Sequence, residues 1–128
     1  MMIFGIHLTN GMYGKKTIDN LLIHMEKAKI VILGSTGMLG SAVSKLFLSD
    51  EKYITYCSHR KKDVGDENSF YFDCEDEKSY FETMPKCDYV INCIGAIKPM
   101  MVKDIEKGIY LNSIFPRKLS KYCVKNNI

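Results

Sequence analysis

Three glycines at intervals of three, Gly34-x-x-Gly37-x-x-Gly40, constrain this chain more than any other feature. They follow residues 29–33, a short, β-branched and almost wholly apolar run that predicts a strand buried on both faces, as in a parallel sheet. They precede residues 38–49, whose apolar residues recur at helical spacing. A strand, a tight glycine turn and a helix in this order predict the first unit of an α/β fold.

The rest of the chain continues the alternation of strands and helices. The other elements expected are strands over 53–57, 70–72 and 89–94, a charged loop over 58–68, and helices over 75–84 and 102–126. A kink is expected at Pro116, because proline lacks an N–H and crowds the preceding turn. Together these predict an α/β fold with a partial Rossmann-like, doubly wound parallel sheet of about four strands.

Composition bounds the class of protein. The chain has 128 residues, of which 46% are hydrophobic and 26% charged, as in an ordinary globular domain. The net charge of +3 is too small to indicate a nucleic acid or a membrane surface as partner. No apolar run approaches the ~20 residues of a membrane span.

Cysteines and histidines show no metal-binding or nucleophile pattern. The five cysteines are odd in number and include no C-x-x-C pair, which disfavours a zinc site and a disulfide framework. They fit a reducing, cytoplasmic location. His7, His24 and His59 have neither metal-ligand nor catalytic-triad spacing. We therefore expect no metal site.

Residues 1–28 lie outside the regular pattern, apart from one amphipathic helix expected over 17–27. They lack the basic stretch and long apolar core of a signal peptide. We expect an N-terminal extension over 1–28 and a nucleotide-binding half-domain over 29–128. Met25 would be a natural start for a chain opening directly into the first strand.

The glycine motif is the arrangement that a dinucleotide pyrophosphate requires. Gly34 permits the sharp turn, Gly37 lets the backbone approach the phosphates, and Gly40 lets the helix pack closely on the strand. The free N–H groups and the positive end of the helix dipole then face the phosphate charge. The alternative is a plain glycine-rich turn. The candidate phosphate-binding residues are Gly34, Thr36, Gly37, Met38, Leu39 and Gly40.

The G-x-x-G-x-x-G spacing resembles the extended short-chain dehydrogenase/reductase superfamily. Residues 31–40 look most like its sugar-nucleotide branch, the dTDP-4-dehydrorhamnose reductase family, and the resemblance extends over residues 29–126. It implies an NAD(P)-dependent oxidoreductase of dTDP-rhamnose and polysaccharide biosynthesis, which transfers hydride to a nucleotide-linked keto-sugar. The alternatives are a fragment of an NAD-dependent sugar epimerase or dehydratase, and a non-catalytic NAD(P)-binding sensor.

The end of the second strand normally contacts the adenosine ribose, and a carboxylate there selects NAD. This chain instead has the cationic stretch Ser58-His59-Arg60-Lys61-Lys62. Such a stretch suits the 2′-phosphate of NADP, with Arg60 as the bidentate partner. NAD is the second choice, and a solvated charged loop is the alternative interpretation.

Two further segments are assigned to the cofactor by the resemblance. Asp73 and Cys74 would lie against the adenine, with the carboxylate accepting from the amino group and the Cys74 N–H donating. Asp73 could equally cap a helix that begins near Glu75. Cys93, Gly95, Ala96 and Ile97 match the segment that lines the cofactor after the fourth strand, although the family often has a threonine at Ile97.

Asn112 interrupts an apolar stripe of the last helix, formed by Ile105, Ile109, Pro116, Leu119 and Cys123. The spacing predicts that this stripe faces the sheet, so that the amide is buried and needs hydrogen-bond partners. The resemblance implies that this asparagine supports the active site. A structural asparagine bonded to backbone is the alternative.

The catalytic pair of the resembling reductases, a tyrosine with a lysine four residues later, is absent from these 128 residues. None of the eight tyrosines has lysine at that position, so no catalytic residue is assigned. We therefore expect the first half of a longer enzyme, without its sugar-binding part. In a sheet of order 3-2-1-4-5-6, the fourth strand would be left as a bare edge. Marginal stability or self-association through that edge is expected.

Overall fold

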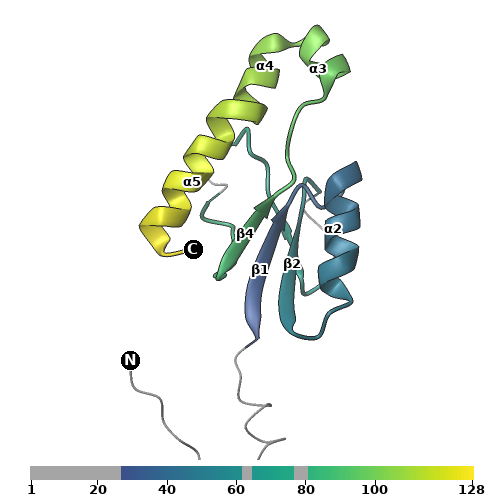
Figure 1. Ribbon diagram of the computed structural model, residues 1–128, viewed down its shortest axis with the longest axis vertical. Coiled ribbons are helices and arrows are strands. Elements are labelled where there is room, and N and C mark those ends of the chain that lie inside the picture. Colours follow the sequence, from purple (N-terminus) through teal and green to yellow (C-terminus); the bar gives the residue numbers. More distant parts are fainter. Residues whose placement is uncertain (1–26, 62–64, 77–80) are drawn as a thin grey trace, which may run out of the picture.

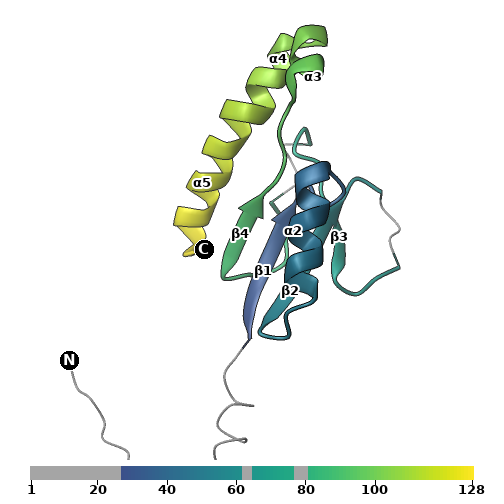
Figure 2. The ribbon, with the colours of Figure 1, turned by 45° about the vertical axis from the view of Figure 1, so that its right-hand side comes forward.

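The computed structural model describes residues 27–61, 65–76 and 81–128. Its centre is a four-stranded parallel sheet in the order β3-β2-β1-β4, which confirms the predicted α/β class and strand order (Figure 2). The strands are β1 (Ala28–Leu33), β2 (Tyr53–His59), β3 (Ser69–Tyr71) and β4 (Tyr89–Asn92). Among the described residues β4 pairs only with β1, so its outer edge is where the predicted self-association would occur.

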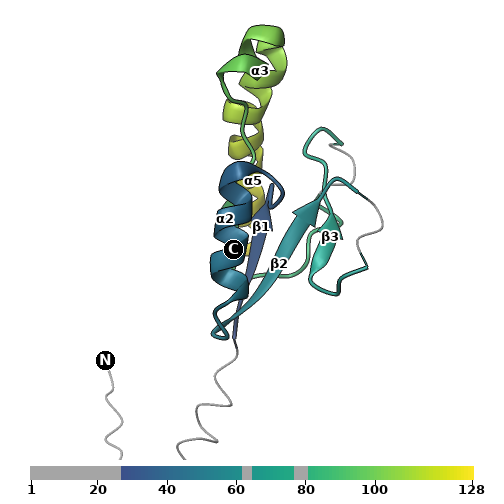
Figure 3. The same ribbon diagram turned by 90° about the vertical axis from the view of Figure 1, so that its right-hand side faces the viewer.

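Helices cover both faces of the sheet. Helix α2 (Met38–Leu48) lies on one face, and the long helical segment that ends in α5 (Phe115–Asn126) lies on the other (Figures 1 and 3). Val31, Ile32 and Leu33 of β1 are each 0% exposed. Since alternate residues of a strand face opposite ways, both layers bury them. The apolar run from Ile30 to Leu33 fits this placement between two layers.

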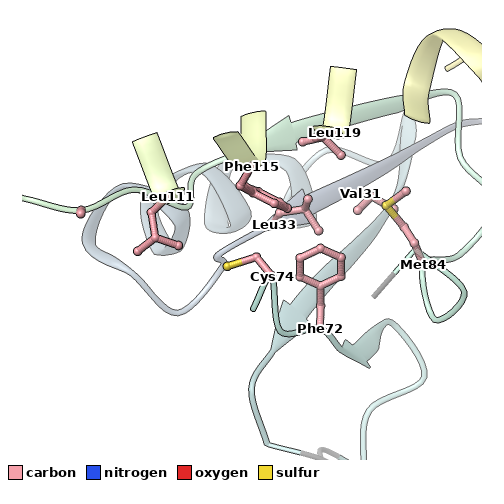
Figure 4. Packing of buried hydrophobic residues seen from close by; sticks show 9 residues of the cluster. Val31, Leu33, Phe72, Cys74, Met84, Leu111, Phe115 and Leu119 are labelled. Atoms are coloured by element: carbon pink, nitrogen blue, oxygen red, sulfur yellow. The ribbon is translucent and has the colours of Figure 1, made fainter. Parts of the chain in front are cut away.

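The larger core lies between the sheet and α5. Val31 and Leu33 meet Phe72, Phe115 and Leu119 there (Figure 4). The rings of Phe72 and Phe115 pack edge to face, with centroids 6.1 Å apart. This contact ties α5 to the segment that follows β3, which is also the edge of the candidate site described below.

The helix expected over 102–126 is not continuous. It is divided into α3 (Lys98–Lys103), α4 (Ile105–Ile109), the π-helical turn η1 (Tyr110–Ile114) and α5. Asp104 separates the first two, and its Oδ1 accepts a hydrogen bond from the Lys107 N–H at 2.9 Å. The irregularity expected at Pro116 takes the form of η1, in which the Phe115 N–H donates to the Tyr110 carbonyl. This wider, π-helical turn precedes Pro116, whose ring would crowd a preceding turn of ordinary α-helix.

The predicted sheet-facing stripe of this helix is wrong in its N-terminal part and correct at Leu119 and Cys123. Ile105 and Ile109 are 57% and 48% exposed. Leu119 is buried in the core as predicted and Cys123 packs against it, whereas Leu111 and Phe115 are buried where Asn112 and Pro116 were expected. The π-helical turn holds more residues than an α-helical turn, and so shifts the face that an α-helical spacing predicts.

The helix predicted over 75–84 does not form in its described residues. Residues 75–76 and 81–84 form turns and bends, and 77–80 lie outside the described residues. The helix expected over 17–27, and nearly all of the extension over 1–28, also lie outside them.

In the described part of the chain, no helix has the length and apolar character needed to cross a membrane. The five cysteines are all free thiols.

Candidate functional site

The turn between β1 and α2 is tight and depends on Gly34. Its φ is +76°, in the left-handed region that glycine adopts without strain. The Gly37 N–H closes the turn by donating to the Gly34 carbonyl at 3.0 Å. A Cβ on Gly34 would also lie 2.9 Å from Ile94 Cγ1, on the segment that follows β4. A side chain at Gly34 would therefore disturb both the turn and its neighbour.

Gly40 lets α2 pack directly on this turn. A Cβ there would overlap the Gly34 carbonyl oxygen and lie 2.7 Å from the Gly34 carbonyl carbon. Both atoms belong to the backbone, so they cannot move aside as the end of a side chain could. Gly40 is buried and serves the fold.

Gly37 is different, because the protein itself leaves room for a side chain there. A Cβ on Gly37 would be 3.4 Å from the Gly34 oxygen, the nearest atom within 4 Å, and its φ of −76° is ordinary. Gly37 is the N-cap of α2, which has no side-chain cap and no acidic residue in its first turn. The unpaired N–H groups and the helix dipole of such a terminus favour an anion.

Two serines join the glycine turn to the end of β2. The Gly34 N–H donates to Ser58 Oγ at 2.8 Å, and Ser35 Oγ donates to the Ser58 carbonyl at 2.6 Å. Ser58 is 3% exposed and Ser35 is 6% exposed. These bonds hold the glycine turn and the end of β2 together, a role of Ser58 that the sequence did not reveal.

A cleft of about 250 Å³ opens at the carboxyl ends of the strands. This is where parallel α/β sheets bind ligands. The predicted site residues that line it are Gly34, Thr36, Gly37, Ser58, His59, Arg60, Asp73, Cys74, Cys93 and Gly95. They come from the ends of β1, β2, β3 and β4, and the fold brings them together at one edge of the sheet.

The remaining predicted residues do not line the cleft. The side chains of Met38, Leu39 and Ile97 are 91%, 61% and 66% exposed. Gly40 and Ala96 are buried in the packing around the turn and the segment after β4.

Asn112 is exposed, so the prediction of a buried amide is wrong. It lies in η1, where the π-helical turn changes the face it presents. Its amide nevertheless has partners: Oδ1 accepts from the Ala96 N–H at 2.7 Å, and Nδ2 donates to the Ala96 carbonyl at 2.9 Å. The Asn112 side chain thus fixes the segment after β4 by bonding to the backbone of Ala96.

The turn after β3 forms the far side of the cleft. Asp73 Oδ1 accepts from the Glu75 N–H at 3.0 Å, so the carboxylate caps a turn rather than the expected helix. The Tyr110 hydroxyl donates to the Cys74 carbonyl at 2.8 Å. Lys107 Nζ pairs with Glu75 Oε2 at 2.6 Å. Helical residues thus hold this turn at two points.

Sequence reasoning missed the residues that α3, α4 and η1 bring to the cleft. These helices lie beyond the carboxyl end of the sheet (Figure 1). Only this placement shows that Met100, Lys107 and Leu111 line it, and no local spacing indicates it. Phe72, Glu75 and Ile94, which also line the cleft, adjoin predicted residues and could have been proposed from that proximity.

The two cysteines of the cleft are protonated at neutral pH. Burial, followed by the charges of Asp73 and Glu75, raises the pKa of the Cys74 thiol to about 11. Burial also raises the pKa of Cys93. Because the thiolate is the reactive form, neither residue is poised as a nucleophile.

A parallel sheet in this order, with a glycine turn leading into α2 and a cleft at the strand ends, defines a partial Rossmann-like fold. The model of the NAD dependent epimerase/dehydratase family matches residues 30–128, and the chain belongs to that family. The family lies in the extended short-chain dehydrogenase/reductase superfamily, which confirms that part of the predicted resemblance.

One curated relative extends the comparison. The chain is 30% identical over 123 residues to the bifunctional polymyxin resistance protein ArnA of Wigglesworthia glossinidia brevipalpis. The match covers 88% of this chain and 19% of that protein. The chain thus spans about a fifth of the length of the relative it matches.

Proposed function

We propose that this chain binds a nicotinamide–adenine dinucleotide in the cleft, with the pyrophosphate over the turn from Gly34 to Gly40. The observation that carries the proposal is Gly37. The fold leaves space for a side chain there, at the uncapped start of α2, and the residue is nevertheless glycine. A phosphate that approaches the backbone would fill that space and accept from the free N–H groups.

We propose NADP(H) as the preferred form. Arg60 lines the cleft just past the end of β2, and no carboxylate occurs among residues 58–61. The Ser58 hydroxyl already accepts from Gly34, and His59 Nε2 lies 3.1 Å from Ser69 Oγ. Arg60 is therefore the side chain of this stretch best suited to hold a 2′-phosphate.

The adenine would lie against the turn after β3. Asp73 and Cys74 line the cleft there, and the Tyr110 hydroxyl holds the Cys74 peptide in place. The segment from Cys93 to Ile97 would border the cofactor beyond the glycine turn. Asn112 fixes the Ala96 peptide of that segment, so its proposed part in the site is to position backbone.

The bound nicotinamide would supply or accept hydride at a sugar attached to a nucleotide. The residues described here bind and orient the dinucleotide. We propose a reductase of the dTDP-4-dehydrorhamnose type, on the resemblance carried by residues 31–40. Epimerase or dehydratase chemistry is the second candidate, and the description of the matched family is compatible with it. Net consumption of NADPH during turnover would identify the reductase.

Replacing Arg60 by alanine should lower NADPH affinity about tenfold and leave NADH affinity nearly unchanged. A charge-assisted bond to phosphate contributes about 1.5 kcal/mol, and NADH has no phosphate at that position. Calorimetric titration with both dinucleotides measures the effect. Arg117→Ala, on the exposed surface of α5, removes the same charge as a control. Equal losses for NADPH and NADH would contradict the assignment of Arg60.

A further inference from the structure

An ion pair joins two sides of the cleft. Lys107 lies on α4, Glu75 lies in the turn after β3, and both line the cleft. Their charged atoms, Nζ and Oε2, are 2.6 Å apart, and the side chains are 35% and 44% exposed. The site described above gives neither residue a role toward a ligand.

Arg60 shares this end of the cleft with the pair. The hydrogen bond to Glu75 is the main cause that raises the pKa of Lys107, whereas the nearby Arg60 charge acts to lower it. The Arg60, Asp73 and Glu75 charges also act on the Cys74 thiol. These side chains are therefore within electrostatic reach of one another, and Lys107 is a cation at neutral pH.

The charges that line this end nearly cancel without a ligand. Arg60 and Lys107 are cationic, and Asp73 and Glu75 are anionic. A phosphate monoester carries about −1.5 to −2 charges near neutral pH. Arg60 alone cannot balance it, and Lys107 is the second cationic lysine or arginine among the described residues of the cleft. Glu75 offsets that second charge.

We propose that the Glu75–Lys107 pair sets how strongly the cleft distinguishes a 2′-phosphorylated adenosine ribose from an unphosphorylated one. Lys107 is the specificity-determining cation, acting together with Arg60, and Glu75 weakens its attraction for the phosphate. This inference rests on the proposed binding of a dinucleotide in the cleft. It concerns the ratio of the two affinities rather than which dinucleotide binds more tightly.

The two partners give opposite results if the pair acts on ligand charge. Lys107→Met removes a cation, whereas Glu75→Gln removes an anion and leaves Lys107 free to face the phosphate. If the pair served only to hold the turn after β3 against α4, either substitution would break the same link. Both variants would then lose affinity for both dinucleotides in the same direction.

The test titrates the full 128-residue chain and its variants with NADPH and with NADH, and compares the ratio of dissociation constants. Because the pair is partly exposed, modest effects are expected. Lys107→Met should lower the preference for NADPH about fivefold, and Glu75→Gln should raise it about threefold. Lys103→Met and Glu51→Gln remove the same charges from exposed positions outside the cleft, and should leave the ratio unchanged.

Salt provides a measurement that needs no stable variant. Raising the ionic strength should reduce the NADPH preference of the unmodified chain, because screening weakens the attraction of exposed cations for the extra phosphate.

An unchanged ratio of dissociation constants in both the Lys107→Met and the Glu75→Gln variants, or a shift in the same direction in both, would overturn the inference alone. Failure of the unmodified chain to bind either dinucleotide would overturn the proposed function and this inference with it.

Discussion

Replacing Gly40 by alanine should destabilise the fold by about 3 kcal/mol, at the upper end of what overpacking costs. The added Cβ would overlap the Gly34 carbonyl oxygen, and the Ser35 Cα would lie at 2.9 Å. These are backbone atoms of a turn that hydrogen bonds hold to the end of β2, so α2 itself must move away. Thermal unfolding should show a midpoint lower by more than about 10 °C.

Gly65→Ala is the matched control for this experiment. It is the same substitution, and no atom of the described residues beyond its chain neighbours lies within 4 Å of the position a Cβ would take at Gly65. Its melting temperature should differ little from that of the unmodified chain. A Gly40→Ala variant as stable as the Gly65→Ala variant would show that α2 does not pack on the turn as described.

Replacing Gly37 by alanine should abolish most dinucleotide binding while the fold persists. The protein leaves space for that methyl group, whereas a pyrophosphate placed over the turn would collide with it. Overpacking of this kind costs about 2 kcal/mol, which corresponds to an affinity about thirtyfold lower. Calorimetric titration with NADPH measures the loss, and the melting temperature should stay within a few degrees.

The Gly37 and Gly40 variants together separate ligand binding from folding. Gly37→Ala should change affinity without changing stability, and Gly40→Ala should change stability first. Unchanged NADPH affinity in the Gly37→Ala variant would place the pyrophosphate elsewhere. A large loss of stability in that variant would show that Gly37 serves the fold, and would remove the main support for the proposed function.

Local patterns predicted the βα unit at the start of the described chain. The buried run that ends at Leu33, the glycine turn and the helix after it depend on contacts between near neighbours in sequence. The predicted strand order was also confirmed, since it is the order that a doubly wound sheet gives its first four strands. The short strand β3 lies one residue earlier than predicted, at Ser69–Tyr71, which is ordinary uncertainty at an element's ends.

The rest of the site depends on contacts that no local pattern contains. The π-helical turn from Tyr110 to Ile114 changes which face of the helix meets the sheet, and so Asn112 is exposed rather than buried. Lys107 meets Glu75 only because α4 lies beside the turn after β3, 32 residues away in sequence. Such pairings arise from the tertiary fold rather than from spacing.

The resemblance drawn from the glycine motif is confirmed at the level of the superfamily by the family match over residues 30–128. The narrower assignment to the reductase branch stays a prediction, as does the preference for NADP. Both depend on side chains such as Arg60, whose ligand contacts are proposed above. The Arg60→Ala titration addresses the preference directly.

The most direct test of the proposed function is an amide chemical-shift titration of the ¹⁵N-labelled chain with NADPH. We predict saturable shifts that are largest for the turn from Gly34 to Gly40, for residues 58–60 and for residues 73–75, with the far end of α5 unaffected. Absence of saturable shifts, or shifts confined to residues outside the cleft, would contradict the claim that this cleft binds a dinucleotide.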